Sequence, residues 1–521
     1  MYGLQQFFIF FFSHPLQLAS LLLFLFLSAK FLLLLSNKES NSNSPPSPWK
    51  LPILGNLHQL GTHPHRTLRS LSLSHGPLFL LRLGSAPTLV ASSPESAKQI
   101  MKTHDLAFSN RPYSAISNRL LYNYKDLSQT PYSAYWRQMR AICVTRLLSA
   151  RRVDSFRHIR EQEAALLVAT IEEGASHGTL LDLGELISRM TNDVVCRVAF
   201  GRKYGDDDDG EEEGGRKFKL MLEEFGAVLG TVNVADFIPW LGWVNRFNGL
   251  DRRVEKVFAE FDEFLDRVVE DHRLTTEEKS EEEEEEEEKD IVDVLLQIQR
   301  ETPDSAVDRD TIKAIVLDMF AAGSDTTYTA LEWTMTEILR HPRVMEKLQQ
   351  EIRVILGDER NVREEVIERM DYLKAVIKES FRLHPPIPLL VPRESTQDVK
   401  VQGYDVPEKT RVIVNAWAIG RDSKRWGDDA EEFRPERFLN SKVDFKGQDF
   451  ELIPFGAGRR GCPGISFATA SMEITLVSML HRFDWSVPGG EEGGGLDADE
   501  APGLAVHRRT PLLAVPTLYS P

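Results

Sequence analysis

The feature that most constrains this chain is a single cysteine, Cys462, in the sequence Phe-Gly-Ala-Gly-Arg-Arg-Gly-Cys-Pro-Gly at residues 455–464. Glycines let a backbone turn tightly and approach a flat ligand closely. An apolar segment at residues 465–480 follows and is predicted to be a helix. The thiol is therefore expected beside a helix N-terminus and two arginines, Arg459 and Arg460, which favour the thiolate. The fold has to present one sulfur at the end of a tight loop.

The cysteine count narrows the role of that sulfur. Cys143, Cys196 and Cys462 lie far apart and form no Cys-x-x-Cys pair, which argues against a disulfide framework and a structural zinc site. Cys143 and Cys196 lie in apolar, helical-looking stretches and are expected to be buried in the core. A thiolate with no second thiolate nearby suits the single axial position of a haem iron.

The same loop also matches the dinucleotide fingerprint G-x-G-x-x-G at Gly456, Gly458 and Gly461. That motif needs a preceding strand, a following helix and an acidic residue about 20 positions on. Asp484 roughly meets the last condition, but Pro454 interrupts the strand and no repeated βαβ pattern surrounds the site. Dinucleotide binding is therefore disfavoured.

The first 35 residues predict a membrane anchor. Residues 16–35 carry only Lys30 as a formal charge, and about 20 apolar residues span a bilayer as a helix. Lysines follow this run and no lysine or arginine precedes it, so the positive-inside rule places the large body on the cytosolic side. A cleaved signal peptide is the alternative, but the run is too long and lacks a basic n-region and a clear A-x-A site.

A polar and proline-rich segment, residues 36–52, is expected to be a stiff hinge to one large body at residues 53–521. That body is predicted to be mainly α with a minor β part. Residues 78–83 and 88–91 predict a β-hairpin, and residues 311–340 a long helix. Further helices are predicted at residues 134–148, 151–174, 185–200 and 249–272, and further strands at residues 399–401 and 411–415.

The formal net charge of -17 is concentrated in acidic runs at residues 206–213 and 281–288. Like-charge blocks repel themselves and are expected to be solvated loop insertions, and they lack the alternating ligands of an EF-hand loop. No basic stripe or RNA-binding signature is present, so nucleic acid is not an expected partner.

Four motifs in order resemble the cytochrome P-450 superfamily. Phe455, Gly458, Arg460, Cys462 and Gly464 meet the haem-loop pattern F-x-x-G-x-R-x-C-x-G. The other motifs are Glu379-Ser-Phe-Arg382 (E-x-x-R), Phe433-Arg-Pro-Glu-Arg-Phe438, and Ala322-Gly-Ser-Asp-Thr-Thr327 of the oxygen-binding helix.

The resemblance covers residues 45–521 and extends to the plant A-type microsomal branch. The proline-rich hinge, Trp136-Arg-Gln-Met-Arg140 and Pro385-Pro-Ile-Pro388 are similar to that branch. The fold it implies is the cytochrome P-450 fold carried on an N-terminal transmembrane helix, with a haem b whose iron is bound by Cys462.

The resemblance also assigns roles to other side chains. The haem-binding set that it implies is Trp136, Arg140, Arg393, Arg460 and Phe455, with the first four as partners of the propionates. Glu379, Arg382 and Arg437 would form a buried network that supports the haem loop.

Asp325 and Thr326 are the predicted catalytic pair. They lie in a helix of small residues that can approach a porphyrin face, and a carboxylate and a hydroxyl there could relay protons to bound dioxygen. The alternative is that the threonine hydroxyl bonds back to a helix carbonyl and bends the helix.

The expected substrate pocket is mostly apolar, which selects small hydrophobic ligands without sharp discrimination. Its residues are Ile387, Leu389, Leu390, Val391 and Leu504.

Together these features predict a monooxygenase anchored in the endoplasmic reticulum membrane and in contact with its lipid. It would insert one oxygen atom from dioxygen into an apolar plant metabolite such as a terpenoid, coumarin or phenylpropanoid. No nucleotide or flavin site is visible, so electrons from NADPH are expected through NADPH-cytochrome P-450 reductase. One alternative is a dehydratase or isomerase that needs no dioxygen and acts, for example, on an aldoxime. A second alternative is a haem sensor. The Asp325-Thr326 pair argues against both.

Overall fold

The computed structural model describes residues 15–36, 43–204, 212–278, 289–302, 306–488 and 495–520. The acidic insertions expected at residues 206–213 and 281–288 lie outside this part, apart from the backbone of the first residues of one helix. The statements below apply to the described residues.

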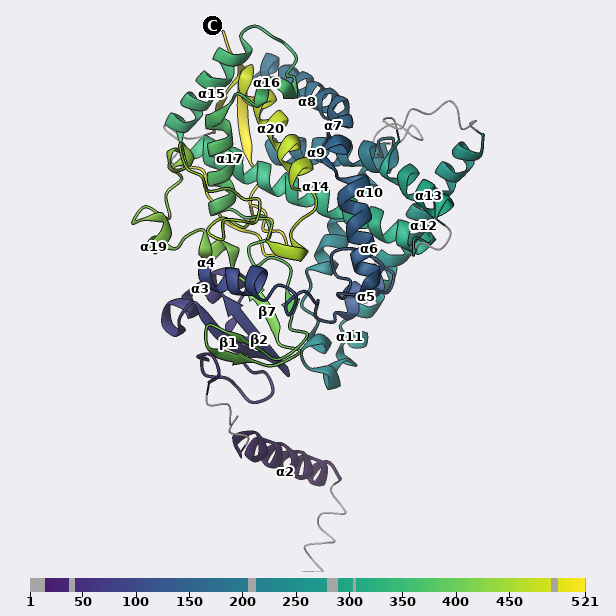
Figure 1. Cartoon of the computed structure of the whole chain (residues 1–521), viewed down its shortest axis with the longest axis vertical. Coiled ribbons are helices and arrows are strands. Elements are labelled where there is room, and N and C mark those ends of the chain that lie inside the picture. The colour runs from purple at the N-terminus through teal and green to yellow at the C-terminus, as the bar shows by residue number, and fades with distance from the viewer. Residues whose placement is uncertain are drawn as a thin grey trace, which may run out of the picture.

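A four-stranded sheet stands at one end of the body (Figure 1). The predicted hairpin is confirmed as β1 (Leu78–Leu83) and β2 (Ala86–Ala91), which pair antiparallel around Gly84 at φ 61°. β7 (Arg411–Val414) runs parallel to β2, and β4 (Arg393–Glu394) pairs antiparallel with β7. Strand β4 thereby fixes Arg393 within the sheet.

The longest helix of the body, α14 (Arg309–Arg340), crosses its middle (Figure 1). Asp308 caps its N-terminus by accepting a hydrogen bond from the Thr311 backbone N–H. It packs against α9 (Leu183–Phe200) and α20 (Ile465–His481), and nearly all of its second half is buried. The predicted long helix and the helix after the cysteine loop are therefore confirmed.

Most other predicted elements are present, but two of the predicted helices are not continuous. The segment at residues 134–148 is α6 (Ala134–Ile142) followed by a π-helical turn (Cys143–Leu147). The segment at residues 151–174 is divided at Phe156, where φ is -85° and ψ is 7°. It forms α7 (Ala150–Ser155) and α8 (Arg157–His177).

A second sheet was not predicted from the sequence. Its strands are β3 (Leu181–Asp182), β9 (Leu513–Leu518) and β8 (Phe483–Ser486), in the order β3-β9-β8. The predicted strand at residues 399–401 is β5 (Val399–Val401), paired with β6 (Tyr404–Val406).

The remaining helices complete the α-rich body. They are α3 (Pro64–His75), α4 (Pro94–Lys98), α5 (Ala115–Leu120), α10 (Glu212–Leu229), α11 (Val244–Phe247), α12 (Leu250–Glu278), α13 (Ile291–Glu301), α15 (Pro342–Leu356), α16 (Glu364–Ile367), α17 (Asp371–Leu383), α18 (Ala416–Ile419) and α19 (Ser423–Trp426).

The main apolar core surrounds α9, α14, α17 and α20. Cys143 and Cys196 are both 0% exposed within it, which confirms the expectation that they are buried. Burial raises the pKa of the Cys143 thiol to about 12. These two sulfurs are therefore inert core side chains.

The N-terminal helix α2 (Pro15–Ser36) lies outside the body, at the end that carries the first sheet (Figure 1). Where its side chains are described, its apolar stretch covers Ala19–Ser28. In the described part of the chain no single helix is both long and apolar enough to cross a membrane. The membrane-spanning role of residues 16–35 therefore stays a prediction.

Candidate functional site

Cys462 ends a tight loop that is closed by its own backbone. The Cys462 N–H donates to the Phe455 carbonyl at 2.9 Å, and the Gly461 N–H donates to the Gly458 carbonyl at 3.0 Å. Gly458 has φ +70°, and a Cβ there would lie 2.1 Å from the Met101 carbonyl oxygen. A side chain at this position is therefore excluded both by the backbone conformation and by the neighbouring chain.

The loop is also tied to the rest of the body. Arg393 donates to the Ala457 carbonyl at 2.6 Å and pairs with Asp105 at 3.2 Å. Asp105 in turn accepts from the Arg459 backbone N–H at 3.2 Å. These contacts hold the sulfur-bearing turn in one position.

Cys462 is exposed, whereas Cys143 and Cys196 are buried. Desolvation raises the pKa of Cys462, while the Gly464 N–H, 3.3 Å from Sγ, and the charge of Arg140 act in the opposite direction. The expectation that Arg459 and Arg460 stabilise the thiolate is wrong, because Arg459 pairs with Asp105 and Arg460 bonds backbone carbonyls.

Arg460 is buried against the backbone of the loop before α6. Its guanidinium donates to the Ser109 carbonyl at 2.7 Å and the Thr130 carbonyl at 2.6 Å. It also lies 4.1 Å from the ring centroid of Trp136. The Trp136 indole N–H donates to the Leu127 carbonyl at 3.0 Å, so its predicted contact with a propionate stays a prediction.

Four arginines gather here, and of these only Arg393 forms an ion pair in the described residues, with Asp105. Burial lowers the pKa of Arg111, Arg140, Arg393 and Arg460, to about 9 for Arg460, and the positive charge of Arg393 lowers the pKa of Arg460 further. Among the described residues no hydrogen bond or ion pair reaches the Arg140 side chain. Buried cations of this kind suit a dianionic ligand.

Cys462 and the arginine cluster fit the ligands that a haem needs. One accessible thiol can bind the iron, and the arginine cluster can bind two propionates. Arg111 was not among the predicted residues, and the sequence around it, Asn-Arg-Pro, carries no pattern that would single it out.

The predicted Glu379 network is present and fully buried. Glu379 and Arg382 are both 0% exposed and form two hydrogen bonds, at 2.6 and 2.8 Å. Arg437 Nε lies 2.8 Å from Glu379 Oε1, and the Arg434 backbone N–H donates to the same oxygen at 2.7 Å. The network ties α17 to the segment that leads into the cysteine loop.

Phe455 connects α17 directly to that loop. Its ring lies 5.0 Å from that of Phe381 on α17 and 5.6 Å from that of Phe445. The aromatic cluster therefore packs the cysteine loop against α17, the helix that also carries Glu379 and Arg382, and the support of the loop by the Glu379 network stays a prediction.

On α14, Ala322 and Asp325 are exposed although most residues that follow are buried. The Thr326 hydroxyl donates to the Ala322 carbonyl at 2.6 Å, as in the alternative interpretation that the sequence left open. Asp325 Oδ1 lies 3.2 Å from His507 Nε2. The catalytic roles of Asp325 and Thr326 stay predictions.

The two segments that carry the predicted pocket residues contact one another and other parts of the body. A Cβ on Gly230, just after α10, would lie 3.3 Å from the Leu504 backbone nitrogen. The Val506 N–H donates to the Pro386 carbonyl at 3.0 Å, and Arg111 donates to the Val391 carbonyl at 2.8 Å.

The predicted apolar pocket residues differ in their surroundings. Leu504 is 37% exposed, and Ile387 and Val391 are half-buried. Leu390 belongs to the core cluster around β7, and half-buried Leu389 packs on the cluster around β1. Their contact with a substrate stays a prediction.

Asp318 on α14 is a second residue that the sequence did not reveal. Its Oδ2 accepts from the backbone N–H groups of Leu127 at 2.6 Å and Ser128 at 3.0 Å. Burial, with the charge of Asp126, raises the pKa of Asp318 to about 7. Asp318 therefore holds the loop whose Leu127 carbonyl accepts the hydrogen bond from the Trp136 indole N–H.

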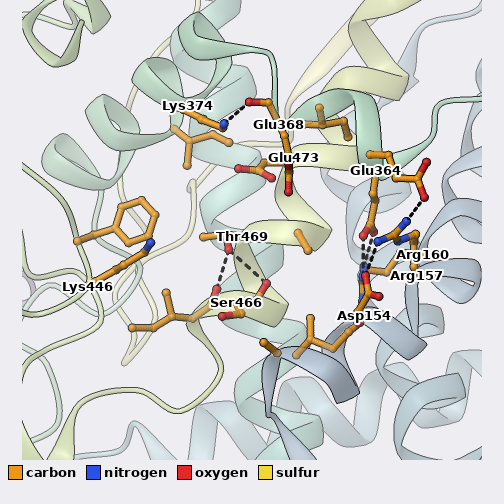
Figure 2. Close-up of a pocket in the computed structure, with 18 of the residues that line it drawn as sticks. Asp154, Arg157, Arg160, Glu364, Glu368, Lys374, Lys446, Ser466, Thr469 and Glu473 are labelled. Carbon is orange, nitrogen blue, oxygen red and sulfur yellow. Dashed lines mark hydrogen bonds and ion pairs between the residues drawn. The ribbon is translucent and has the colours of Figure 1, made fainter. Parts of the chain in front are cut away.

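A separate cavity of about 600 Å³ lies between α20 and the helices α7, α8, α16 and α17 (Figure 2). Its charged lining is largely paired: Arg160 contacts Glu364 at 2.5 Å, and Lys374 donates to the Glu368 carbonyl at 2.5 Å. Burial raises the pKa of Glu473 to about 7. None of the predicted site residues lines this cavity.

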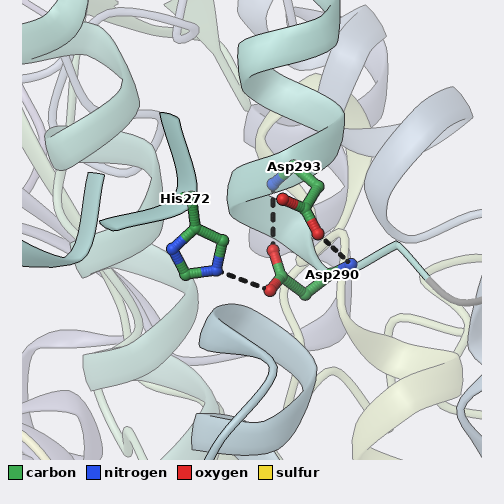
Figure 3. Close-up of side chains that lie close together, drawn as sticks. All are labelled: His272, Asp290 and Asp293. Carbon is green, nitrogen blue, oxygen red and sulfur yellow. Dashed lines mark hydrogen bonds and ion pairs between the residues drawn. The ribbon is translucent and has the colours of Figure 1, made fainter. Parts of the chain in front are cut away.

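His272, Asp290 and Asp293 place potential metal ligands within 4.8 Å of one another (Figure 3). Asp290 and Asp293 form a reciprocal capping box at the start of α13, and His272 Nε2 lies 2.8 Å from Asp290 Oδ2. Helix capping and one ion pair account for the cluster.

Residues 45–513 match the family described as Cytochrome P450. The chain is 53% identical over 506 residues to Cytochrome P450 736A117 of Prunus mume, and the matched region covers 97% of this chain and 96% of that protein. It is 51% identical over 487 residues to Cytochrome P450 71A6 of Nepeta racemosa, covering 92% and 95%. It is 47% identical over 505 residues to norfluorocurarine oxidase of a Strychnos species, covering 96% and 98%.

Solved structures give the same fold. A zebra fish cytochrome P450 with progesterone superposes with a TM-score of 0.73 at 26% identity, covering 87% of this chain and 99% of that chain. A second zebra fish structure, with abiraterone, gives a TM-score of 0.71 at 26% identity, covering 88% and 100%.

Replacing Glu379 tests the buried network. Glu379→Gln leaves Arg382 and Arg437 charged and buried without their anion, so we expect the free energy of unfolding to fall by about 3–5 kcal/mol. The control is Glu255→Gln, which breaks an exposed pair with Arg119 (2.8 Å) and should cost less than about 1 kcal/mol. Urea unfolding of both variants measures the two losses of free energy of unfolding. Equal losses would show that the Glu379 pairs contribute no more than an exposed pair does.

The His272–Asp290 pair predicts a pH-dependent stability. Burial disfavours the imidazolium, but the hydrogen bond and charge of Asp290 outweigh it and raise the pKa of His272 to about 9. Because the folded pKa is above the ordinary 6.5, this stabilisation is complete below pH 6.5 and is lost as the pH rises through about 9. We expect His272→Gln to lower the free energy of unfolding by about 2–3 kcal/mol at pH 6 and by almost nothing at pH 10. A difference in denaturant midpoint between wild type and His272→Gln that does not change with pH would refute this stabilisation.

Proposed function

Because the chain belongs to the cytochrome P450 family, whose members are haem-thiolate monooxygenases, we propose that this enzyme inserts one oxygen atom from dioxygen into an apolar plant specialised metabolite. Electrons would come from NADPH through NADPH-cytochrome P-450 reductase. The observation that carries the proposal is the single accessible thiol of Cys462 in a tight loop near Arg140 and Arg460, which form no ion pair in the described residues.

Several residues would hold the haem. Cys462 would bind the iron, and Arg140, Arg393 and Arg460 would bind the propionates, with Trp136 against Arg460. When bound, the haem supplies the chemistry of dioxygen activation, and a thiolate ligand favours cleavage of the O–O bond. The Gly464 N–H would stabilise the sulfur anion, and Phe455 would keep the loop packed on α17.

The chain's own contribution to the reaction would be proton delivery and water exclusion. The Asp325 carboxylate would take up a proton and pass it to the Thr326 hydroxyl, which has to leave its bond to the Ala322 carbonyl to donate it onward. The accessible surface of Ala322 and Asp325 supports this role, because both side chains can be reached just before the buried second half of α14.

The substrate class is inferred from the apolar side chains of Ile387, Val391 and Leu504, which favour terpenoid-, coumarin- or phenylpropanoid-like ligands. Relatives of this chain act in plants, and one of them is named for oxidation of norfluorocurarine. Hydroxylation is the proposed outcome.

We further propose that residues 16–35 anchor the enzyme in the endoplasmic reticulum membrane, with the body in the cytosol. The length and composition of the run and the lysines after it support this arrangement.

Turnover tests the proposed function. Microsomes containing the full chain and a plant NADPH-cytochrome P-450 reductase, incubated with a plant extract, should add one oxygen atom to an apolar metabolite. Isotope-labelled dioxygen should supply that atom, and omission of NADPH or reductase should abolish the product. The protein should stay in the membrane fraction after a carbonate wash. Full activity without dioxygen and NADPH would instead identify a dehydratase or isomerase.

A further inference from the structure

A histidine from the C-terminal loop contacts the proposed relay directly. His507 Nε2 lies 3.2 Å from Asp325 Oδ1, and Nδ1 lies 2.9 Å from the Thr329 hydroxyl. Asp325 and Thr329 are one helical turn apart on α14, so the imidazole bridges that turn. The side chains of His507 and Asp325 are 29% and 48% accessible, so neither is sealed in the core.

The loop that carries His507 is held in place by its neighbours. The Trp333 indole N–H donates to the Val506 carbonyl at 2.7 Å, and the Val506 N–H donates to the Pro386 carbonyl at 3.0 Å. The Tyr328 ring stacks on the His507 imidazole, with the centroids 5.3 Å apart and the planes at 26°. The imidazole therefore has one defined position relative to α14.

The groups around the ring can satisfy an imidazolium. The Thr329 hydroxyl lies 2.7 Å from the Asp325 backbone carbonyl oxygen and 2.9 Å from His507 Nδ1, so when it donates to the carbonyl its oxygen accepts from Nδ1–H. In this form the second ring N–H, at Nε2, faces the Asp325 carboxylate.

The charges around the ring favour the same form. Asp325, Tyr328 and Glu332 face it from α14, and the charge of Glu223 on α10 also reaches it. Burial disfavours the imidazolium, but the contact with Asp325 outweighs it, and the pKa of His507 is raised. The cation therefore persists above the pH at which a free histidine loses its proton.

We propose that His507, as an imidazolium, is a positioning residue that fixes the Asp325 carboxylate beside Thr326 for proton delivery. The inference rests on the function proposed above, because Asp325 has to be the acid of the relay. Without His507 the carboxylate can rotate away, and protons reach reduced dioxygen less efficiently. More of the dioxygen then leaves after two electrons and two protons as hydrogen peroxide, instead of taking four of each to form two water molecules.

The test uses dioxygen itself as the probe, so no organic substrate is needed. The haem-loaded full chain and reductase are supplied with NADPH, and hydrogen peroxide released per NADPH oxidised is measured for wild type, His507→Gln, His507→Arg and Asp325→Asn. We expect a rise of about threefold or more in His507→Gln and Asp325→Asn at pH 7, and a value near wild type in His507→Arg. His158→Gln is the control, because this exposed ring on α8 bonds the Ser155 backbone carbonyl at 3.0 Å and contacts no part of the proposed relay among the described residues.

Two further readouts separate positioning from a merely structural role. The peroxide yield of wild type should rise with pH as His507 loses its proton, while that of His507→Arg should stay constant. In histidine-labelled full chain, the NMR titration of His507 should give a pKa above 6.5 that falls in Asp325→Asn. This second measurement does not depend on turnover.

The outcomes distinguish the two proposals. If Asp325→Asn raises the peroxide yield and His507→Gln does not, the positioning role of His507 is overturned and the relay stands. If neither changes it, the relay fails and the role of His507 fails with it. A yield that rises in His507→Gln without rescue by His507→Arg, together with an unshifted pKa of His507, also overturns the positioning role.

Discussion

The structure depends on a positive charge buried without a counter-anion of its own. Arg460 is bonded to backbone carbonyls of the loop before α6, and in the described residues it forms no ion pair. Burial of such a guanidinium costs free energy that a bound carboxylate can recover. The same contacts fix Ser109, Leu127 and Thr130, so the cation both shapes the haem site and orders the chain beside it.

In the cysteine loop too, burial disfavours the charged form of a side chain, here the thiolate of Cys462. Burial raises the pKa of Cys462, and the Gly464 N–H and Arg140 offset only part of this effect. The thiolate therefore needs the charge of a bound iron to become the stable form. The body prepares the position of the sulfur through Arg393, which bonds the Ala457 carbonyl, and through Phe455, which packs on α17, and a bound haem would supply the remaining electrostatic stabilisation.

Features that depend on neighbouring residues could be predicted from the sequence. The glycines of the cysteine loop, the Glu379-x-x-Arg382 spacing and the Gly84 hairpin all act over a few positions. Pairings between distant segments could not be predicted. β9 joins β3 and β8 through registers that no local pattern encodes. His507 reaches Asp325 only because the C-terminal loop folds back on α14. The partners of Arg459 and Arg460 were misjudged because closeness in sequence to a thiol does not fix where a long side chain points.

The measurement that tests the central claim most directly is the carbon monoxide difference spectrum of the reduced, haem-loaded chain. The account predicts a thiolate-type spectrum for the full-length protein and its loss in Cys462→Ala, with Cys196→Ala, in the core, unchanged. A thiolate-type spectrum that survives in Cys462→Ala would contradict the assignment of Cys462 as the iron ligand and the site built around it.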